Sequence, residues 1–148
     1  MRWWMAALLA AGCDSGKDEA GKHAHQAPRG GTLVVLAEEF ANLEVKLDGD
    51  RVIVWLLDGH AANPIRSELR ELRLKVALNG KAEEVVLAAV GNVLTGETPG
   101  DTSQFEGSLD SLKGAGRFHA VLSRVVVRGR EFKEVEFHYP EGNEKRTK

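Results

Sequence analysis

The sequence contains very little cysteine: Cys13 is the only one among its 148 residues. A single cysteine cannot form a disulfide within the chain. Without a CxxC pair there is also no basis for a cysteine-type zinc site or thioredoxin chemistry. The motifs of phosphate-binding loops, dinucleotide binding and HExxH metalloproteases are absent as well. These absences remove the most easily recognised redox, nucleotide-dependent and zinc-protease classes.

The chain also lacks an excess of positive charge. Its formal net charge is −2 at pH 7, whereas nucleic-acid binders carry a basic surface that neutralises phosphates. We therefore expect no nucleic-acid partner. Charged residues make up 28% of the chain and hydrophobic residues 43%, which is ordinary for a globular protein, and the length suits one domain.

Long hydrophobic runs are missing too, and a short uncharged apolar run lies at the N-terminus. Arg2 precedes the segment Trp3–Gly12, which as a helix is too short to cross a bilayer, because crossing takes roughly 20 residues. A positive start, a short apolar run and small residues at its end are typical of an export signal. The alternative is an apolar terminus with a chance cysteine, although Trp3 and Trp4 would then form an unusual exposed pair.

The end of this run, AAGC at residues 10–13, resembles the lipobox of bacterial lipoproteins, in which a small residue precedes the cysteine that is lipidated. The sequence departs from the family by having Ala10 where leucine is usual, with Leu9 one position earlier. The resemblance implies that residues 1–12 are a signal peptide and that Cys13 carries acyl chains, which anchor more firmly when there are several. It therefore predicts a lipid-anchored membrane protein on the periplasmic side of a bacterial cell envelope.

The segment of residues 13–28 has no apolar periodicity and is rich in glycine, alanine and charge. It is predicted to be a flexible tether before a domain over residues 29–140, which a polar tail over 141–148 follows. His23 and His25 form an HxH pair, which in a flexible chain could hold zinc or copper weakly. The alternative is two histidines in a polar segment without a specific role.

From Gly31 onward, apolar residues recur with a period of two and are interrupted by turn signals, which indicates an antiparallel all-β domain. An opening strand is expected over Gly31–Leu36 and another over Ser103–Gly107. Short helical turns are expected near residues 65–70 and at 108–113. About seven short strands with hairpin connections favour a small β-sandwich, and a β-barrel is the alternative.

Three hairpins can be placed from their turn residues and apolar faces. The expected connections are Ala41–Leu47 to Arg51–Leu57 through Asp48-Gly49, Leu72–Leu78 to Lys81–Ala89 through Asn79-Gly80, and Arg117–Val127 to Arg130–Tyr139 through Arg128-Gly129. The expected cross-strand pairs are Val45 with Val52 and Leu43 with Val54, Leu74 with Val85 and Leu72 with Leu87, and Ala120 with Phe137 and Leu122 with Val135.

The favoured register of the third hairpin places His119 directly opposite His138, on the face away from the apolar pairs, whereas an even shift of register would keep this face but change the partners. Opposed Cβ atoms lie about 4.5–5.5 Å apart, close enough for two imidazoles to share a metal. Glu136 lies two residues from His138 on the same face, so two histidines and a carboxylate could bind zinc or copper. The alternative is that these polar side chains only line an exposed sheet face.

His60 lies in a turn-rich loop close to Asp58, and the two could be half of a catalytic triad. No serine stands in a nucleophile-elbow motif to complete it. The adjacent carboxylates Glu38-Glu39 and Glu83-Glu84 would point to opposite faces of a strand, so they do not form an acid/base pair. We therefore expect no enzymatic activity.

The stretch PRGGTLVVL at residues 28–36 resembles the start of small periplasmic β domains that carry P-H-G-G before an apolar strand. Some of these domains accompany adaptor subunits of heavy-metal efflux systems. Pro28, Gly30 and Gly31 match, while Arg29 replaces the histidine and weakens a metal role at that position. The two glycines also have a structural reason, because glycine lets the chain turn sharply into the first strand.

Three functions stay open at this level. The first is a lipid-anchored envelope protein whose β domain binds a ligand, with zinc or copper handling as the leading specific expectation. The second is a structural or assembly module that contacts another envelope protein through an edge strand or the loop of residues 90–116. The third is a hydrolase that uses His60.

Overall fold

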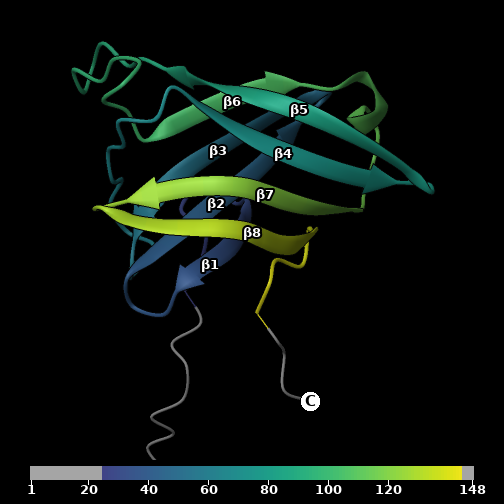
Figure 1. Cartoon of the computed structure of the whole chain (residues 1–148), viewed down its shortest axis with the longest axis horizontal. Coiled ribbons are helices and arrows are strands. Elements are labelled where there is room, and N and C mark those ends of the chain that lie inside the picture. The colour runs from purple at the N-terminus through teal and green to yellow at the C-terminus, as the bar shows by residue number, and fades with distance from the viewer. Residues whose placement is uncertain (1–24, 145–148) are drawn as a thin grey trace, which may run out of the picture.

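The structure is a computed structural model, and it describes residues 25–144. The described chain is all β apart from one turn of 3-10 helix (Figure 1). Its elements are β1 (Thr32–Ala37), β2 (Ala41–Asp48), β3 (Arg51–Asp58), β4 (Glu71–Leu78), β5 (Lys81–Val90), β6 (Gln104–Ser108), η1 (Asp110–Leu112), β7 (Phe118–Val127) and β8 (Arg130–Tyr139). The strands form one 8-stranded sheet in the order β1-β2-β3-β6-β5-β4-β7-β8, and its neighbours are antiparallel.

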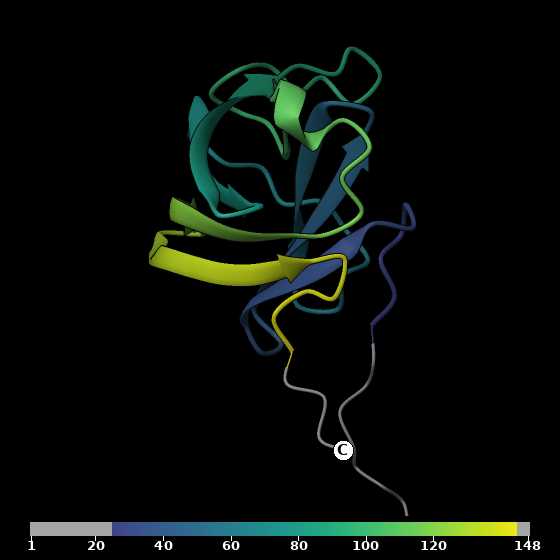
Figure 2. The ribbon, with the colours of Figure 1, turned by 90° about the vertical axis from the view of Figure 1, so that its right-hand side faces the viewer.

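The two edge strands, β1 and β8, approach each other where the sheet curves round (Figure 2). Asn143, which follows β8, donates its side-chain amide to the carbonyl of Val35 at 2.8 Å and accepts the Val35 N–H at 2.8 Å. The Thr32 hydroxyl donates to the carbonyl of Pro140 at 2.9 Å. These bonds nearly close the sheet into a barrel. The predicted antiparallel all-β class is confirmed by the eight strands. Of the two expected arrangements, a β-sandwich and a β-barrel, the barrel fits this single sheet.

The β4–β5 and β7–β8 hairpins have the predicted registers. The observed pairs include Leu74 with Val85, Leu72 with Leu87, Ala120 with Phe137 and Leu122 with Val135. The central turn residues have positive φ, as a type I′ turn requires: Asn79 (52°), Gly80 (76°), Arg128 (50°) and Gly129 (78°). Arginine is a poor residue for this conformation, but the turn still forms at Arg128-Gly129 and sets the β7–β8 partners, while the apolar faces fix only which side chains share a face.

The β2–β3 hairpin keeps the predicted faces but has different partners. Val45 pairs with Val54 instead of Val52, and Leu43 pairs with Leu56 instead of Val54. The turn explains this shift, because its central residues are Gly49 and Asp50, and only Gly49 has a positive φ, of 63°. A shift of two residues leaves every side chain on its face, so hydrophobic alternation does not distinguish the two registers.

The segment of residues 65–70 is extended, and the short helical turn expected there is wrong. Ile65 donates its N–H to the carbonyl of Leu56 at 2.9 Å, and Ser67 forms an isolated bridge with Thr102. The apolar residues with helical spacing instead lie along an extended segment beside β3. The other expected turn is confirmed, because η1 lies within residues 108–113.

Strand β3 is buried on both faces, which explains its nearly continuous apolar sequence. Val52, Val54 and Leu56 belong to the main core inside the sheet. The β3 residues that alternate with them, Ile53, Trp55 and Leu57, form a second cluster on the outer face together with Ala61 from the following loop, and Leu33 packs against this cluster. The guanidinium of Arg29 lies 4.5 Å from the centre of the Trp55 ring, so the chain before β1 covers this outer face.

Candidate metal centre

The predicted pairing of His119 on β7 with His138 on β8 is present in the structure. The centres of the two imidazole rings are 4.9 Å apart. Glu136 lies on the same face of β8, and its Oε1 is 2.6 Å from Nε2 of His119. One ligand atom from each of the three residues lies within 4.8 Å of the others. Two neighbouring strands therefore bring two imidazoles and one carboxylate to a single point.

The site lies on the outer surface of the barrel. The side chain of His119 is 32% exposed and that of Glu136 is 65% exposed. The flanking residues Phe118 and Phe137 are buried in the core on the opposite face. The backbone at the site is consequently held by core packing, while the three polar side chains stay accessible to an ion from solvent.

A hollow of about 490 Å³ opens beside His138. Its walls are formed by Ala77, Leu78, Asn79, Arg117, Phe118, His138, Tyr139 and Glu141. Arg117 and Glu141 form an ion pair at this hollow. The rings of Phe118 and Tyr139 stack with centres 4.9 Å apart and give the hollow an aromatic wall. His138 belongs to both features, so the hollow adjoins the histidine cluster.

The donor set of this cluster suits a borderline divalent metal. Imidazole nitrogen and carboxylate oxygen both bind zinc and copper(II), and three protein ligands leave further positions for water or another ligand. An ionised Glu136 carboxylate can only accept a hydrogen bond, so the 2.6 Å contact corresponds to the tautomer of His119 that carries its proton on Nε2. Metal binding through Nε2 would replace this proton, so affinity is expected to fall at low pH.

Of the other predicted site residues, Cys13, the expected lipidation site, and His23, an expected metal ligand, lie outside the described residues. His25 lies beside His60, with ring centres 5.7 Å apart in an edge-to-face arrangement. Within residues 25–144, the cluster of His119, Glu136 and His138 is the only group of three or more potential ligands with suitable spacing. The HxH pair therefore stays a prediction, and His25 has a histidine neighbour that sequence reasoning did not pair with it.

Asp58 uses its carboxylate to hold its own loop. It accepts the N–H of Ala62 at 2.9 Å and the side-chain amide of Asn63 at 2.9 Å. Burial raises its pKa, but these hydrogen bonds outweigh that effect and lower the pKa to about 2. The hydrogen bonds given to this carboxylate come from the backbone and Asn63, with His60 contributing its backbone N–H. The Asp58 carboxylate therefore stabilises its own loop, and these contacts do not orient it toward the His60 ring.

Two buried carboxylates were not found by sequence reasoning. Glu44 is 0% exposed, and its Oε1 accepts the N–H of Arg29 at 2.8 Å and the N–H of Gly31 at 3.0 Å. The guanidinium of Arg29 also lies 3.3 Å from Oε2 of Glu44. The PRGG stretch thus has a structural role in this chain. The only sequence feature that indicates the burial of Glu44 is its position among the apolar residues of β2.

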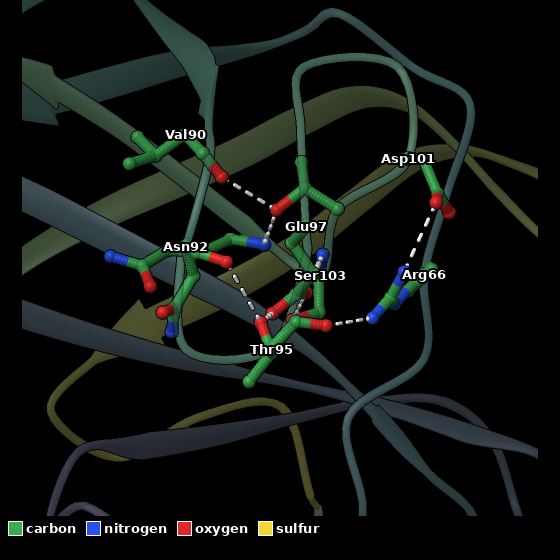
Figure 3. Close-up of polar contacts among 9 residues, drawn as sticks. Arg66, Val90, Asn92, Thr95, Glu97, Asp101 and Ser103 are labelled. Carbon is green, nitrogen blue, oxygen red and sulfur yellow. Dashed lines mark hydrogen bonds and ion pairs between the residues drawn. The ribbon is translucent and has the colours of Figure 1, made fainter.

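The second buried carboxylate is that of Glu97, in the loop between β5 and β6. It is 8% exposed, and its Oε1 accepts the N–H of Ser103 at 2.8 Å. The hydroxyls of Ser103 and Thr95 donate to the same carboxylate (Figure 3). These hydrogen bonds lower the pKa of Glu97, although burial raises it. A glutamate in a Gly- and Thr-rich loop gave no sign of this burial.

No helix among residues 25–144 has the length and apolar character needed to cross a membrane. In comparisons with protein-family models, curated proteins and solved structures, the chain has no significant match.

Proposed function

We propose that this protein binds a divalent transition metal, zinc or copper, on the outer face of its barrel. The observation that carries the proposal is the convergence of His119, Glu136 and His138, whose ligand atoms lie within 4.8 Å of one another. Directly opposed strand residues need little rearrangement to share one ion. The alternative is that Glu136 only accepts a hydrogen bond from His119.

We further propose that the protein handles its metal while anchored to a bacterial membrane through Cys13. Support for the anchor comes from the sequence, in which the AAGC stretch resembles a lipobox and a charged tether follows. Mass spectrometry of protein extracted from membranes tests this part. A mature chain that starts at a diacylated or triacylated Cys13 is expected, and an intact Met1 with a free Cys13 thiol would contradict it.

The metal proposal is tested by titrating the full-length chain with Zn²⁺ and, separately, Cu²⁺. His23→Ala and His25→Ala form the background in every sample, so that the HxH pair does not contribute. Submicromolar binding of one ion per chain is expected, with Cu²⁺ the tighter of the two because of its general preference for nitrogen ligands. Calorimetry gives the affinity, and the copper spectrum reports nitrogen ligation.

Variants of the cluster then locate the binding. His119→Ala with His138→Ala should abolish it, and Glu136→Gln should weaken it at least ~10-fold, because the amide loses the charge that balances the cation. His60→Ala is the matched control, since it removes a histidine from the surface outside the cluster. Equal binding by the parent and the His119/His138 double variant would refute the site.

A further inference from the structure

The hollow beside His138 borders the histidine cluster on the outer face of the barrel. Ala77 on β4 pairs with His119 on β7, and His119 pairs with His138 on β8, so the three residues form one row across neighbouring strands (Figure 1). Directly paired strand residues share a face, and Ala77 is exposed on it. Ala77 and His138 both line the hollow. An ion bound by His138 would therefore lie at the edge of the hollow.

The hollow has the size and the lining of a site for a small molecule. Its volume of about 490 Å³ lies within the usual range of ligand pockets, which is roughly 300–1,000 Å³. Part of its wall is apolar and contains Leu78 and the stacked rings of Phe118 and Tyr139. Another part carries the ion pair of Arg117 and Glu141. A molecule with a flat apolar body and a polar end matches these two parts.

The local charge determines which polar end fits. Without an ion, the carboxylate of Glu136 gives the cluster one negative charge, and the pair of Arg117 and Glu141 adds no net charge. A bound divalent ion would be the largest charge at the site and would leave it with one net positive charge. A molecule with a single negative charge would then balance the site, and its binding would depend on the metal.

A carboxylate group suits both neighbours of that position. Three protein ligands leave a coordination position of the ion open, and carboxylate oxygen is one of the ordinary ligands of zinc. Guanidinium groups bind carboxylates through several N–H donors in a fixed geometry. The side chain of Arg117 is 77% exposed, so it has donors left for a second carboxylate besides that of Glu141.

We infer that the hollow binds a small monocarboxylate with a flat apolar body, whose carboxylate group lies between the metal and Arg117. The inference rests on the metal binding proposed above and names the chemical class of the second ligand at that site. The apolar body would lie against Phe118 and Tyr139, where it would lose contact with water.

Benzoate is the probe, because it has one carboxylate on a flat ring and does not chelate the ion away from the protein. The full-length chain, with His23→Ala and His25→Ala as the background, is saturated with Zn²⁺ and titrated with benzoate in a calorimeter. One benzoate per chain is expected, bound at least 10-fold more tightly than by the same chain without metal. Acetate, which lacks the ring, should bind at least 10-fold more weakly than benzoate. Equal benzoate binding with and without Zn²⁺ would overturn the inference.

Two variants locate the molecule in the hollow. Ala77→Leu fills the hollow from an exposed position, and Arg117→Gln removes the guanidinium. Each should weaken benzoate binding at least 10-fold while Zn²⁺ binding and thermal unfolding stay as in the parent. The matched controls are Ala88→Leu on β5 and Arg124→Gln on β7, which change exposed residues outside the hollow and should leave benzoate binding unaltered. Unchanged benzoate affinity in either hollow variant would overturn the inference.

Failure of the metal proposal gives a different pattern of results. Zn²⁺ binding that is lost in the His119→Ala, His138→Ala variant, together with no benzoate binding by the loaded parent, would overturn only the present inference. No binding of Zn²⁺ with or without benzoate would overturn both proposals. Binding of Zn²⁺ only in the presence of benzoate would contradict metal binding by the chain alone and support the shared site.

Discussion

Glu44 and Glu97 are both buried glutamates that organise a segment of backbone, yet they bind very different partners. Glu44 accepts the amides of Arg29 and Gly31 and also pairs with the guanidinium of Arg29. Glu97 accepts one amide and two hydroxyls, from Ser103 and Thr95. The negative charge of Glu44 is balanced largely by the Arg29 guanidinium and by backbone amides. The negative charge of Glu97 is balanced largely by neutral groups of its own loop.

The two sites also differ in how far along the chain they reach. Glu44 binds Arg29 across 15 positions of sequence, and so fastens the segment before β1 over the outer cluster around Trp55. Glu97 binds Ser103 only 6 positions away. Long-range contacts that cover a core contribute to global stability, whereas contacts inside one loop mainly determine local opening. The comparison predicts that similar substitutions have global effects at Glu44 and local effects at Glu97.

The largest effect is expected from Glu44→Ala. It removes the acceptor of two amides and the partner of Arg29, and buried donors left without acceptors cost about 1–3 kcal/mol each. We expect the free energy of unfolding to fall by about 3 kcal/mol. Glu44→Gln keeps an oxygen acceptor and should cost about 1 kcal/mol.

Denaturant unfolding measures this difference, with Glu38→Ala at an exposed site as the matched control. The control should change stability by less than about 0.5 kcal/mol. A loss at Glu44→Ala no greater than in the control would show that the fastening of the N-terminal segment does not contribute to barrel stability.

A smaller effect is expected from adding a methyl group beside Glu44 and beside the backbone of Glu97. A Cβ at Gly31 would lie 2.7 Å from the carbonyl oxygen of Val45 and 3.0 Å from Cγ of Glu44. A Cβ at Gly91 would lie 3.0 Å from the backbone carbonyl oxygen of Glu97, a milder overlap that a shift of a few tenths of an ångström relieves. Overpacking against fixed backbone costs about 1–3 kcal/mol. Gly31→Ala should therefore cost about 2 kcal/mol and Gly91→Ala under ~1 kcal/mol, and thermal unfolding that ranks them in reverse would contradict the comparison.

Glu97→Ala should act mainly on its loop. Ser103 and Thr95 lose their shared acceptor, so local opening of residues 91–103 should become easier by about 1 kcal/mol. Amide hydrogen exchange should speed up in this loop and stay unchanged in β4 and β7. Asp101→Ala is the control, since it removes only an exposed pair with Arg66. Faster exchange throughout the barrel would show that the loop is not an independent unit.

The hairpin registers that could be predicted were those whose two turn residues were identified correctly. These residues are Asn79-Gly80 between β4 and β5 and Arg128-Gly129 between β7 and β8, whereas the apolar face of β7 and β8 fixes only which side chains lie on the same side. The juxtaposition of His119 with His138 follows from the β7–β8 register. The β2–β3 register differed because Gly49 can occupy either central position of a two-residue turn, and the hydrophobic pattern is blind to a shift of two.

The rest of the architecture depends on contacts that have no local pattern. Near-closure of the barrel uses Asn143 and Val35, which are far apart in sequence. The burial of Glu44 depends on backbone N–H groups of the PRGG stretch. A turn alone already explains the glycines of this stretch, so the sequence does not indicate the contact with Glu44. The short separation between Glu136 and His119 depends on side-chain rotamers, so the sequence could predict the shared face but not the 2.6 Å contact.

The smallest effect concerns pH. It distinguishes the contribution of the negative charge of Glu97 from the contribution of the size and shape of its side chain. Burial raises the pKa of Glu97, but hydrogen bonds from Ser103 and Thr95 and the charge of Arg66 outweigh it, so the pKa in the folded protein is lowered. A lowered folded pKa means that the carboxylate stabilises the loop above the ordinary glutamate value of 4.5 and loses this contribution as the pH falls through the folded pKa.

Hydrogen exchange in residues 91–103, corrected for its intrinsic pH dependence, should show less protection at low pH. Glu97→Gln should start with less protection and show a flat profile, since its amide does not titrate. A profile in Glu97→Gln that still follows the parent would assign the pH dependence to another group, and the hydroxyls of Ser103 and Thr95 would then hold the loop without needing a charge.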